Sequence, residues 1–500
     1  MLDTGYTEKV VVIGAGISGL TCAFRLKQLG IPCLVLETKE RAGGVIATIR
    51  RNGCVFETGP QFPRFPAPLW RLVRDLKLEN EFVAGNAKAK RYIFRYDRFH
   101  PAPLSPIGLI KTQLVGLKSK LRILSEPFGY SQPPKDEESL ADFVERKFNA
   151  EVLDNLVDPF ISTIFLGDAS KMGMESAFPA LVGWERRRGS LLRGAIRART
   201  SRQNQPKRGG ASLQLGSERD ARSGTNTNGA RLHVTDALPM LGSFKSGMAT
   251  LPEKLSEELR SAIRYRVQID TIAPQPPDGG TSSSRWEVRL HEGERIRAEH
   301  VVLAVPAYVA ASLLESSAPE LAGRLRSIEY APISTVSCAY KQSSVKNSLD
   351  GFGFMIPRRE GLHTFCTFWN SSLLRGRAPE GTVLITSFAG RQEDDAFATM
   401  TDEQRTESVA AENAHILGIT ERAVDRVFWK DARALPQYNV GHAQRVAAIS
   451  DVLRTLPNLH LSGNFLKGRS IGDCVEVASQ VAENLHSQLH RQNIQADIGC

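Results

Sequence analysis

The N-terminal stretch Lys9-Val-Val-Val-Ile-Gly14-Ala-Gly16-Ile-Ser-Gly19 decides the fold class, because in it an apolar strand runs directly into a glycine-patterned turn. Gly14 permits a tight turn, Gly16 lets a pyrophosphate approach the main chain, and Gly19 lets the following helix lie close to the strand. The N-terminus of that helix offers free N–H groups to phosphates. A second apolar strand ends in Glu37, whose carboxylate can accept hydrogen bonds from ribose hydroxyls. The pattern predicts a dinucleotide-binding β-α-β unit.

The residues that follow Glu37 indicate which dinucleotide is bound. Arg41 and the pair Gly43-Gly44 come within seven residues of this acid. Arg41 can neutralise pyrophosphate charge, and two adjacent glycines let the backbone pass close to a ribityl chain and a flavin ring. A nicotinamide enzyme has no need of this second segment. The sequence therefore favours FAD, with an ordinary glycine turn as the alternative for Gly43-Gly44.

Bulk properties bound the remaining possibilities. The chain has 500 residues, enough for more than one domain. Its seven cysteines are scattered without a C-x-x-C pair, which predicts reduced thiols and neither disulfides nor a metal site. The first strand starts so early that we expect no cleavable targeting segment. No uninterrupted apolar run reaches the roughly 18 residues of a spanning helix.

The net charge of +10 is not spread evenly along the chain. From Arg186 to Arg208 there are nine arginines and lysines and no acid. Such a run is either a solvated helix face or a site for anionic lipid headgroups, and the lack of interleaved aromatic residues disfavours nucleic acid. Residues 109–124 alternate apolar and basic side chains at near-helical spacing. Core packing and a position in a bilayer interface both explain that pattern.

The order of the segments predicts an α/β fold. Residues 1–60, 233–307 and 450–495 carry the strand and helix patterns of a Rossmann-like FAD-binding domain assembled from three segments. The last of these ends a strand in Gly463 and then starts a long helix near Ser470, which offers the cofactor a second helix N-terminus.

Other modules are inserted between the three segments. Residues 61–90 and 308–449 hold several strand candidates and predict a mixed α+β substrate-binding domain with its own sheet. Residues 91–199 begin with a short extended stretch and are then mainly helical in pattern, so they predict an inserted helical domain. Residues 200–232 are rich in Ser, Gly, Asn and Arg and predict a flexible loop.

Several of these segments together resemble the oxygen-dependent protoporphyrinogen oxidases, within the flavin amine oxidase-like superfamily. The resemblance runs from Val10 to about Leu485, apart from the loop, and rests on the order and spacing of its motifs. These are Ile164-Phe-Leu-Gly167-Asp168, Ser176-Ala-Phe178-Pro179, Gly242-Ser-Phe-Lys-Ser-Gly247-Met, Gly351-Phe-Gly353-Phe-Met-Ile-Pro357, Leu435-Pro436-Gln437-Tyr438 with Gly441-His442, and Gly463 through Gly472-Asp473-Cys474.

The resemblance implies that FAD is held by residues of three distant segments. They are Gly14, Ala15, Gly16, Ile17, Ser18, Gly19, Glu37, Thr38, Arg41, Gly43, Gly44, Gly59, Pro60, the main chain at Val267, and Asn464, Arg469, Ser470 and Ile471.

The resemblance also implies a tetrapyrrole site. Arg91 would bind a propionate, and the main-chain carbonyl of Thr163 would face the pyrrole N–H groups. The side chains that sandwich the macrocycle would be Met355, Phe368 and Phe388. This chain departs from the family pattern at Thr163, where glycine is common, and in the stretch Gln61-Phe-Pro-Arg-Phe-Pro.

The implied reaction oxidises protoporphyrinogen IX to protoporphyrin IX, the penultimate step of haem synthesis, while three O2 are reduced to three H2O2. No side-chain acid or base and no metal is assigned, because the flavin carries the chemistry. Coproporphyrinogen III oxidation is the nearest alternative, and a non-catalytic FAD-binding membrane adaptor is the alternative from another class. The family setting implies that the helical domain associates peripherally with a membrane, on the cytoplasmic face of a bacterial inner membrane or on the mitochondrial inner membrane, and that the enzyme is a homodimer.

Overall fold

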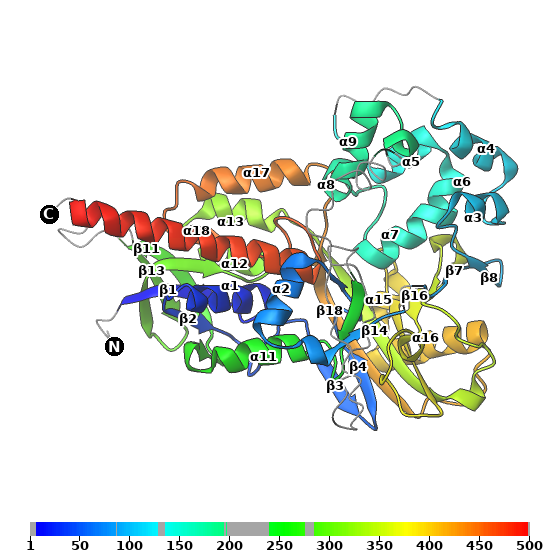
Figure 1. Ribbon diagram of the computed structural model, residues 1–500, viewed down its shortest axis with the longest axis horizontal. Helices are drawn as coiled ribbons and strands as arrows, with labels where there is room; N and C mark the ends of the chain where they lie inside the picture. Colours follow the sequence, from blue (N-terminus) through cyan, green and yellow to red (C-terminus); the bar gives the residue numbers. More distant parts are fainter. Residues whose placement is uncertain are drawn as a thin grey trace, which may run out of the picture.

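Figure 1 shows the computed structural model of the chain, which is a mixed α/β protein, as predicted. The predicted loop 200–232 and the end of the basic run lie outside the residues that the structure describes. The described residues are 7–86, 88–128, 136–194, 197, 240–275 and 285–498.

The first sheet has seven strands contributed by separate parts of the chain. Their order is β10 (Ile263–Arg264), β2 (Cys33–Leu36), β1 (Thr7–Ile13), β13 (Arg295–Leu303), β12 (Arg285–Leu290) and β11 (Ile269–Gln275), with β19 (Leu459–Leu461) also on β13. β1 pairs in parallel with β2 and β13, while β11, β12 and β13 are antiparallel. The glycine turn after β1 therefore opens at the carboxyl end of the central strands.

Helices cover both faces of the first sheet (Figure 1). On β1, Val10 and Val12 belong to one core and Val11 and Ile13 to the other, so the strand is apolar on both sides. One face is covered by α1 (Ile17–Gln28), α2 (Ala67–Asp75), α11 (Thr250–Glu258) and α18 (Ile471–Ile498). The other is covered by α12 (Ala307–Leu314), α13 (Pro319–Arg326) and α17 (His442–Leu453).

The second sheet also has seven strands. Their order is β18 (Asp425–Pro436), β14 (Tyr330–Lys341), β17 (Thr382–Ala389), β16 (Thr364–Phe368), β15 (Gly353–Met355), β7 (Arg91–Arg95) and β8 (Arg98–Pro101). All neighbours are antiparallel except β15 and β7. α16 (Asp402–Leu417) packs on one face. α14 (Asn370–Leu373) and α15 (Asp395–Thr399) are short helices in the connections.

The domain boundaries drawn from the sequence differ from this arrangement in two places. The extended stretch beginning at Arg91 was assigned to the helical domain, but β7 and β8 lie at the edge of the second sheet because Phe94 and Phe99 pack on Phe354 there. Residues 61–90 were assigned to the substrate-binding domain, but the apolar face of α2 lies in the core of the first sheet. The position of these short elements along the chain did not show which hydrophobic core they join.

Two small sheets connect the larger ones. β3 (Thr48–Arg51) and β4 (Cys54–Glu57) form a hairpin. β5 (Arg64–Phe65), β9 (Met240–Phe244) and β6 (Phe82–Ala84) form a three-stranded sheet. Phe65, Phe82 and Phe244 meet edge to face beneath it.

Helices between β8 and β9 form a separate layer above the second sheet (Figure 1). Leu166 ends α7 in the left-handed region at φ +52°, and α7 packs against β16 and β15. A π-helical turn, Leu153–Val157, precedes α7. The helices are α3 (Pro106–Lys111), α4 (Leu117–Ser125), α5 (Leu140–Lys147), α6 (Ala150–Val152), α7 (Asp158–Phe165), α8 (Met174–Ala177) and α9 (Pro179–Arg188).

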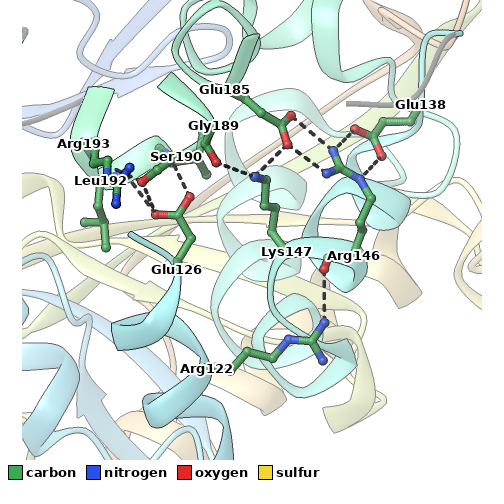
Figure 2. A network of polar contacts seen from close by, with 11 residues as sticks. Arg122, Glu126, Glu138, Arg146, Lys147, Glu185, Gly189, Ser190, Leu192 and Arg193 are labelled. Carbon is green, nitrogen blue, oxygen red and sulfur yellow. Dashed lines mark hydrogen bonds and ion pairs between the residues drawn. The ribbon is translucent and has the colours of Figure 1, made fainter. Parts of the chain in front are cut away.

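A buried polar network holds this helical layer together (Figure 2). The carboxylate of Glu185, whose residue is 2% exposed, lies 2.8 Å from Arg146 and 2.7 Å from Lys147. Burial opposes its charge, but the two cations outweigh burial and lower the pKa of Glu185. Glu126 accepts hydrogen bonds from Ser190 Oγ at 2.7 Å and from the following backbone amides. The start of the basic run is therefore tied to the helical layer.

Candidate functional site

The glycine turn after β1 has the geometry that a pyrophosphate site needs. Gly14 lies in the left-handed region at φ +100°, and its N–H donates to the carbonyl of Leu36 at 2.8 Å. A Cβ on Gly19 would lie 1.9 Å from the carbonyl oxygen of Gly14, so only glycine lets α1 begin this close to the turn. A Cβ on Gly16 would meet no protein atom within 4 Å. The main chain at Gly16 thus faces open space that a phosphate can enter.

Glu37 lies beside this turn at the end of β2. It is 7% exposed, and its carboxylate accepts hydrogen bonds from the amides of Ala15 at 2.7 Å and Lys39 at 2.9 Å. The neighbouring Thr38 hydroxyl lies 3.3 Å from the same carboxylate. The amide of Val267 donates to the Glu37 carbonyl at 3.0 Å, which brings the predicted Val267 contact to the same place.

The second glycine segment folds back onto the first. The amide of Gly43 donates to the Ala15 carbonyl at 2.8 Å, and a Cβ on Gly44 would lie 3.3 Å from Gly16 Cα. Arg41 bonds the carbonyls of this loop, including that of Gly44 at 3.0 Å, and stays exposed beside it. A Cβ on Gly59, just before Pro60, would lie 2.3 Å from the carbonyl oxygen of Val45.

The third predicted cofactor segment lies at the start of α18. Ser470 and Asp473 cap that helix reciprocally: Ser470 Oγ accepts from the Asp473 amide at 3.1 Å, and the Ser470 amide donates to the Asp473 carboxylate at 3.0 Å. Ile471 is buried in the core that also holds Ile17 of α1. Burial raises the pKa of the Cys474 thiol to about 11, although a hydrogen bond with Ser18 acts to lower it. The first turns of α1 and α18 are therefore adjacent.

Arg469 lies between this segment and the helical layer. Its guanidinium carbon is 3.3 Å from the centroid of the Phe165 ring, and Nη1 donates to the Ile164 carbonyl at 3.3 Å. Burial lowers the pKa of Arg469 to about 10. The hydroxyl of Tyr438 donates to the Asn464 carbonyl at 2.7 Å. The predicted cofactor segment is thus fixed to α7 and to the residues just after β18.

The predicted substrate residues meet on the face of the second sheet that α7 covers. Phe62, Phe352, Phe368 and Phe388 form an aromatic cluster, with ring centroids 5.0 Å apart for Phe62 and Phe352 and 5.3 Å apart for Phe368 and Phe388. The guanidinium of Arg91 lies over the Phe352 ring, 4.6 Å from its centroid. Met355 and Leu166 both pack against the buried side chains around Phe388.

Thr163 lies on α7, at the side of this cluster. Its hydroxyl donates to the Pro159 carbonyl at 2.8 Å. In the last turn of α7, the carbonyls of Ser162, Ile164 and Phe165 accept hydrogen bonds from the Leu166 amide, Arg469 and Gln437. Within the described part of the chain, the Thr163 carbonyl has no such partner. This is the carbonyl expected to face the substrate.

Comparison with known proteins identifies the family. Residues 17–486 match the model of the flavin containing amine oxidoreductases. The chain belongs to this family.

Individual relatives within the family show which of its members this chain is similar to. A chloroplastic protoporphyrinogen oxidase of Nicotiana tabacum is 30% identical, over 96% of this chain and 86% of its own length. A coproporphyrinogen III oxidase of Bacillus subtilis (strain 168) is 26% identical, over 94% of this chain and 96% of its own length. A crystal structure from Exiguobacterium sp. 255-15 shares the fold, with a TM-score of 0.76, 23% identity, and coverage of 97% and 99% of the two chains.

Membership of the flavin containing amine oxidoreductases confirms the predicted cofactor, FAD, and the resemblance stated from the sequence. The chain is therefore a flavin-dependent oxidoreductase. The residues fit this cofactor, since the space beside Gly16 is open to a pyrophosphate and the two predicted helix N-termini lie together. The individual contacts predicted for FAD and for the tetrapyrrole stay predictions.

Sequence reasoning missed some side chains of the site in this flavin amine oxidoreductase. Phe62 and Phe352 complete the aromatic cluster, and Leu166 packs against it. Gln61 accepts a hydrogen bond from Asn370 at 2.8 Å and so ties the loop before Phe62 to the second sheet. Phe62 lies in the stretch that departs from the family pattern, and an isolated aromatic residue in a loop carries no periodic signal of its partners.

Proposed function

We propose that this flavin amine oxidoreductase is a porphyrinogen oxidase that converts protoporphyrinogen IX to protoporphyrin IX with dioxygen as the acceptor. The observation that carries the proposal is the meeting of three features on one face of the second sheet: Arg91, the apolar cluster around Phe368, and the Thr163 carbonyl, which has no partner among the described residues. A macrocycle with apolar faces, central N–H groups and carboxylates at its edge has the matching chemistry. The names of the relatives support the same substrate class.

Each protein group would bind a different part of the substrate. Arg91 would hold a propionate by a charge-assisted hydrogen bond. The Thr163 carbonyl would accept a hydrogen bond from pyrrole N–H groups, and Met355, Phe368 and Phe388 would exclude water from the ring faces. When bound, FAD would supply a hydride acceptor that dioxygen can reoxidise, and the six-electron oxidation would consume three O2 and yield three H2O2.

Contacts at the end of α7 would hold the proposed substrate residues in a fixed position relative to the predicted cofactor segment. Arg469 and Gln437 bind the carbonyls of Ile164 and Phe165 and leave that of Thr163 free to point elsewhere. Arg469 belongs to the segment that leads into α18, so the same contact joins the substrate side to the cofactor side. Such fixed placement is how a protein lowers the cost of bringing a reacting carbon to a flavin.

The direct test adds porphyrinogens to the FAD-loaded enzyme without oxygen. We expect the flavin absorbance to bleach with protoporphyrinogen IX, and the porphyrin fluorescence to rise after air is admitted. Faster bleaching by coproporphyrinogen III would favour that substrate, in line with the relatives from Bacillus subtilis and Staphylococcus aureus. Bleaching by a primary amine alone would contradict the proposal, and no bleaching by any substrate would favour the adaptor.

We also propose that α3 and α4 dock the enzyme on an anionic membrane, at the cytoplasmic face of a bacterial inner membrane. Within the described residues, no helix is long and apolar enough to span a bilayer. The two helices lie at the end of the helical layer farthest from the first sheet (Figure 1). Lys111, Lys118 and Arg122 accompany their exposed apolar side chains, as in helices that lie in a bilayer interface. The exposed apolar residues are Leu104, Ile107, Ile110, Leu117, Leu121, Leu124 and Phe128.

Vesicle flotation tests the docking surface. The wild type should float with vesicles that contain anionic lipid, and Leu117→Ser with Leu121→Ser should stay at the bottom. The control is Val424→Ser, an exposed apolar residue at 55% (Leu121 is 58% and Leu117 73% exposed), on the second sheet's side of the molecule. Equal flotation of wild type and double variant would contradict the proposal.

A further inference from the structure

Three cations, Lys90, Arg91 and Arg95, lie in β7 or just before it, and of these only Arg91 lacks a counter-charge among the described residues. Lys90 lies 3.0 Å from Asp350, and Arg95 is paired with Glu360. Arg91 lies between them along the chain, yet no carboxylate of the described residues comes within ion-pair distance of it. Its guanidinium rests on the face of Phe352 at the edge of the aromatic cluster. Arg91 is therefore available to an anion from outside the protein.

Arg64 approaches the same edge from another strand. β5 is extended, and Phe65 points into the first core, where its ring lies 4.8 Å from Phe82. Because side chains alternate along an extended chain, Arg64 points away from that core. Phe62 contacts Phe352, the ring on which Arg91 lies. Arg91 thus lies on a ring that Phe62 contacts, and Arg64 follows Phe62 by two residues along the chain.

The charges of the two arginines act on each other. Burial is the larger cause that lowers the pKa of Arg91, and the positive charge of Arg64 is the second. Arg64 is exposed, and it too has no carboxylate within ion-pair distance among the residues described. The buried Arg377, by contrast, is paired with Glu57 at 3.4 Å. Two unpaired guanidinium groups at one apolar edge are suited to carboxylates of a ligand.

We propose that Arg64 is a second carboxylate-binding residue, which together with Arg91 holds two carboxylates on one edge of the substrate. The inference rests on the proposed function and deepens it. The substrate must then carry carboxylates on neighbouring pyrrole rings, and one edge of the macrocycle lies at the mouth of the site. Arg64 is a specificity residue in this arrangement and takes no part in the redox step.

Binding of the oxidised porphyrin to the FAD-loaded enzyme tests this without turnover. The probes are protoporphyrin IX and its dimethyl ester, which has the same ring without the two charges. Arg64→Met should weaken binding of the diacid about tenfold, since a lost charge-assisted contact of about 1.4 kcal/mol corresponds to that factor. Binding of the ester should not change, and Arg64→Lys should recover part of the loss. Arg71→Met is the matched control, an exposed arginine on α2.

The outcomes separate this inference from the proposed function. A wild type that binds neither porphyrin, and whose flavin no porphyrinogen bleaches, would overturn the proposed function. A wild type that is active, with an Arg64→Met variant that binds the diacid as tightly as Arg71→Met does, would overturn the role of Arg64 alone. Equal losses for diacid and ester would also overturn it, because they would show a change of shape and not a lost charge contact.

Discussion

The two candidate sites differ in the kind of group that forms them. The cofactor site lies at the carboxyl end of the first sheet, and the substrate site lies on the face of the second sheet that α7 covers. The first uses backbone: the turn at Gly14 and Gly16, the amides at the starts of α1 and α18, and one acid, Glu37. The second uses mainly side chains, an aromatic cluster with Arg91 lying on the ring of Phe352, beside the main-chain carbonyl of Thr163. A backbone site tolerates almost no added atom at its glycines, whereas a side-chain site can exchange one apolar residue for another at moderate cost.

The contrast between a backbone site and a side-chain site predicts that substitution of Gly19 has the largest effect on stability and flavin binding. The Cβ of Gly19→Val would lie 1.9 Å from a backbone oxygen that cannot move aside, so we expect loss of both the fold and the flavin, with about 4 kcal/mol or more lost in the free energy of unfolding. Gly16→Ala adds its methyl to open space, so the fold should survive while FAD binds about tenfold more weakly. Urea unfolding and the flavin-to-protein absorbance ratio measure both. A yellow, stable Gly19→Val protein would contradict this account of the backbone site.

A smaller loss is expected at the junction between the two regions. Glu57 of β4 and Arg377 are 3% and 2% exposed and lie 3.4 Å apart. Burial raises the pKa of Glu57 although Arg377 opposes it. Arg377→Met would leave this carboxylate buried without its cation and should lower the free energy of unfolding by about 3–5 kcal/mol near neutral pH.

The pH dependence of that loss gives a second readout. A carboxyl whose pKa is raised in the folded state binds its proton more tightly there than in the unfolded chain, so stability falls as pH rises through that pKa. The Arg377→Met variant should therefore regain stability as the pH is lowered from neutral toward the ordinary carboxyl range. Denaturant titrations at several pH values measure this. Arg375→Met, an exposed arginine two residues away, should match the wild type throughout.

The smallest expected effects come from substitutions on the two faces of the second sheet, which should change different quantities. Phe354 is 2% exposed in the core under α16, whereas Phe388 belongs to the aromatic cluster under α7. Phe388→Leu should raise the KM for the porphyrinogen roughly fivefold, about 1 kcal/mol, with little change in Tm. Phe354→Leu should lower Tm at a cost of about 1 kcal/mol and leave KM unchanged. Similar KM values for the two variants would place the substrate elsewhere.

The predictions from the sequence succeeded where the requirement is local. Gly14, Gly16, Gly19 and Glu37 lie in one β-α-β unit, and their spacing follows from backbone geometry over a few residues. The strand assigned to the helical layer shows the limit, because β7 joins the second sheet through β15, more than 250 residues away. Short strands carry too little pattern to name such a partner.

The amino-acid sequence by itself predicted a dinucleotide bound by backbone, and its second glycine segment singled out FAD, the cofactor that family membership confirms. Those conclusions hold without the fold, because steric limits on φ and on close approach act within a few residues. Only the tertiary structure showed that Phe62 and Phe352 complete the aromatic cluster and that, among the described residues, the Thr163 carbonyl has no hydrogen-bond partner. These depend on which distant strands pair and on which helix end is held by Arg469, and packing of the whole chain sets both.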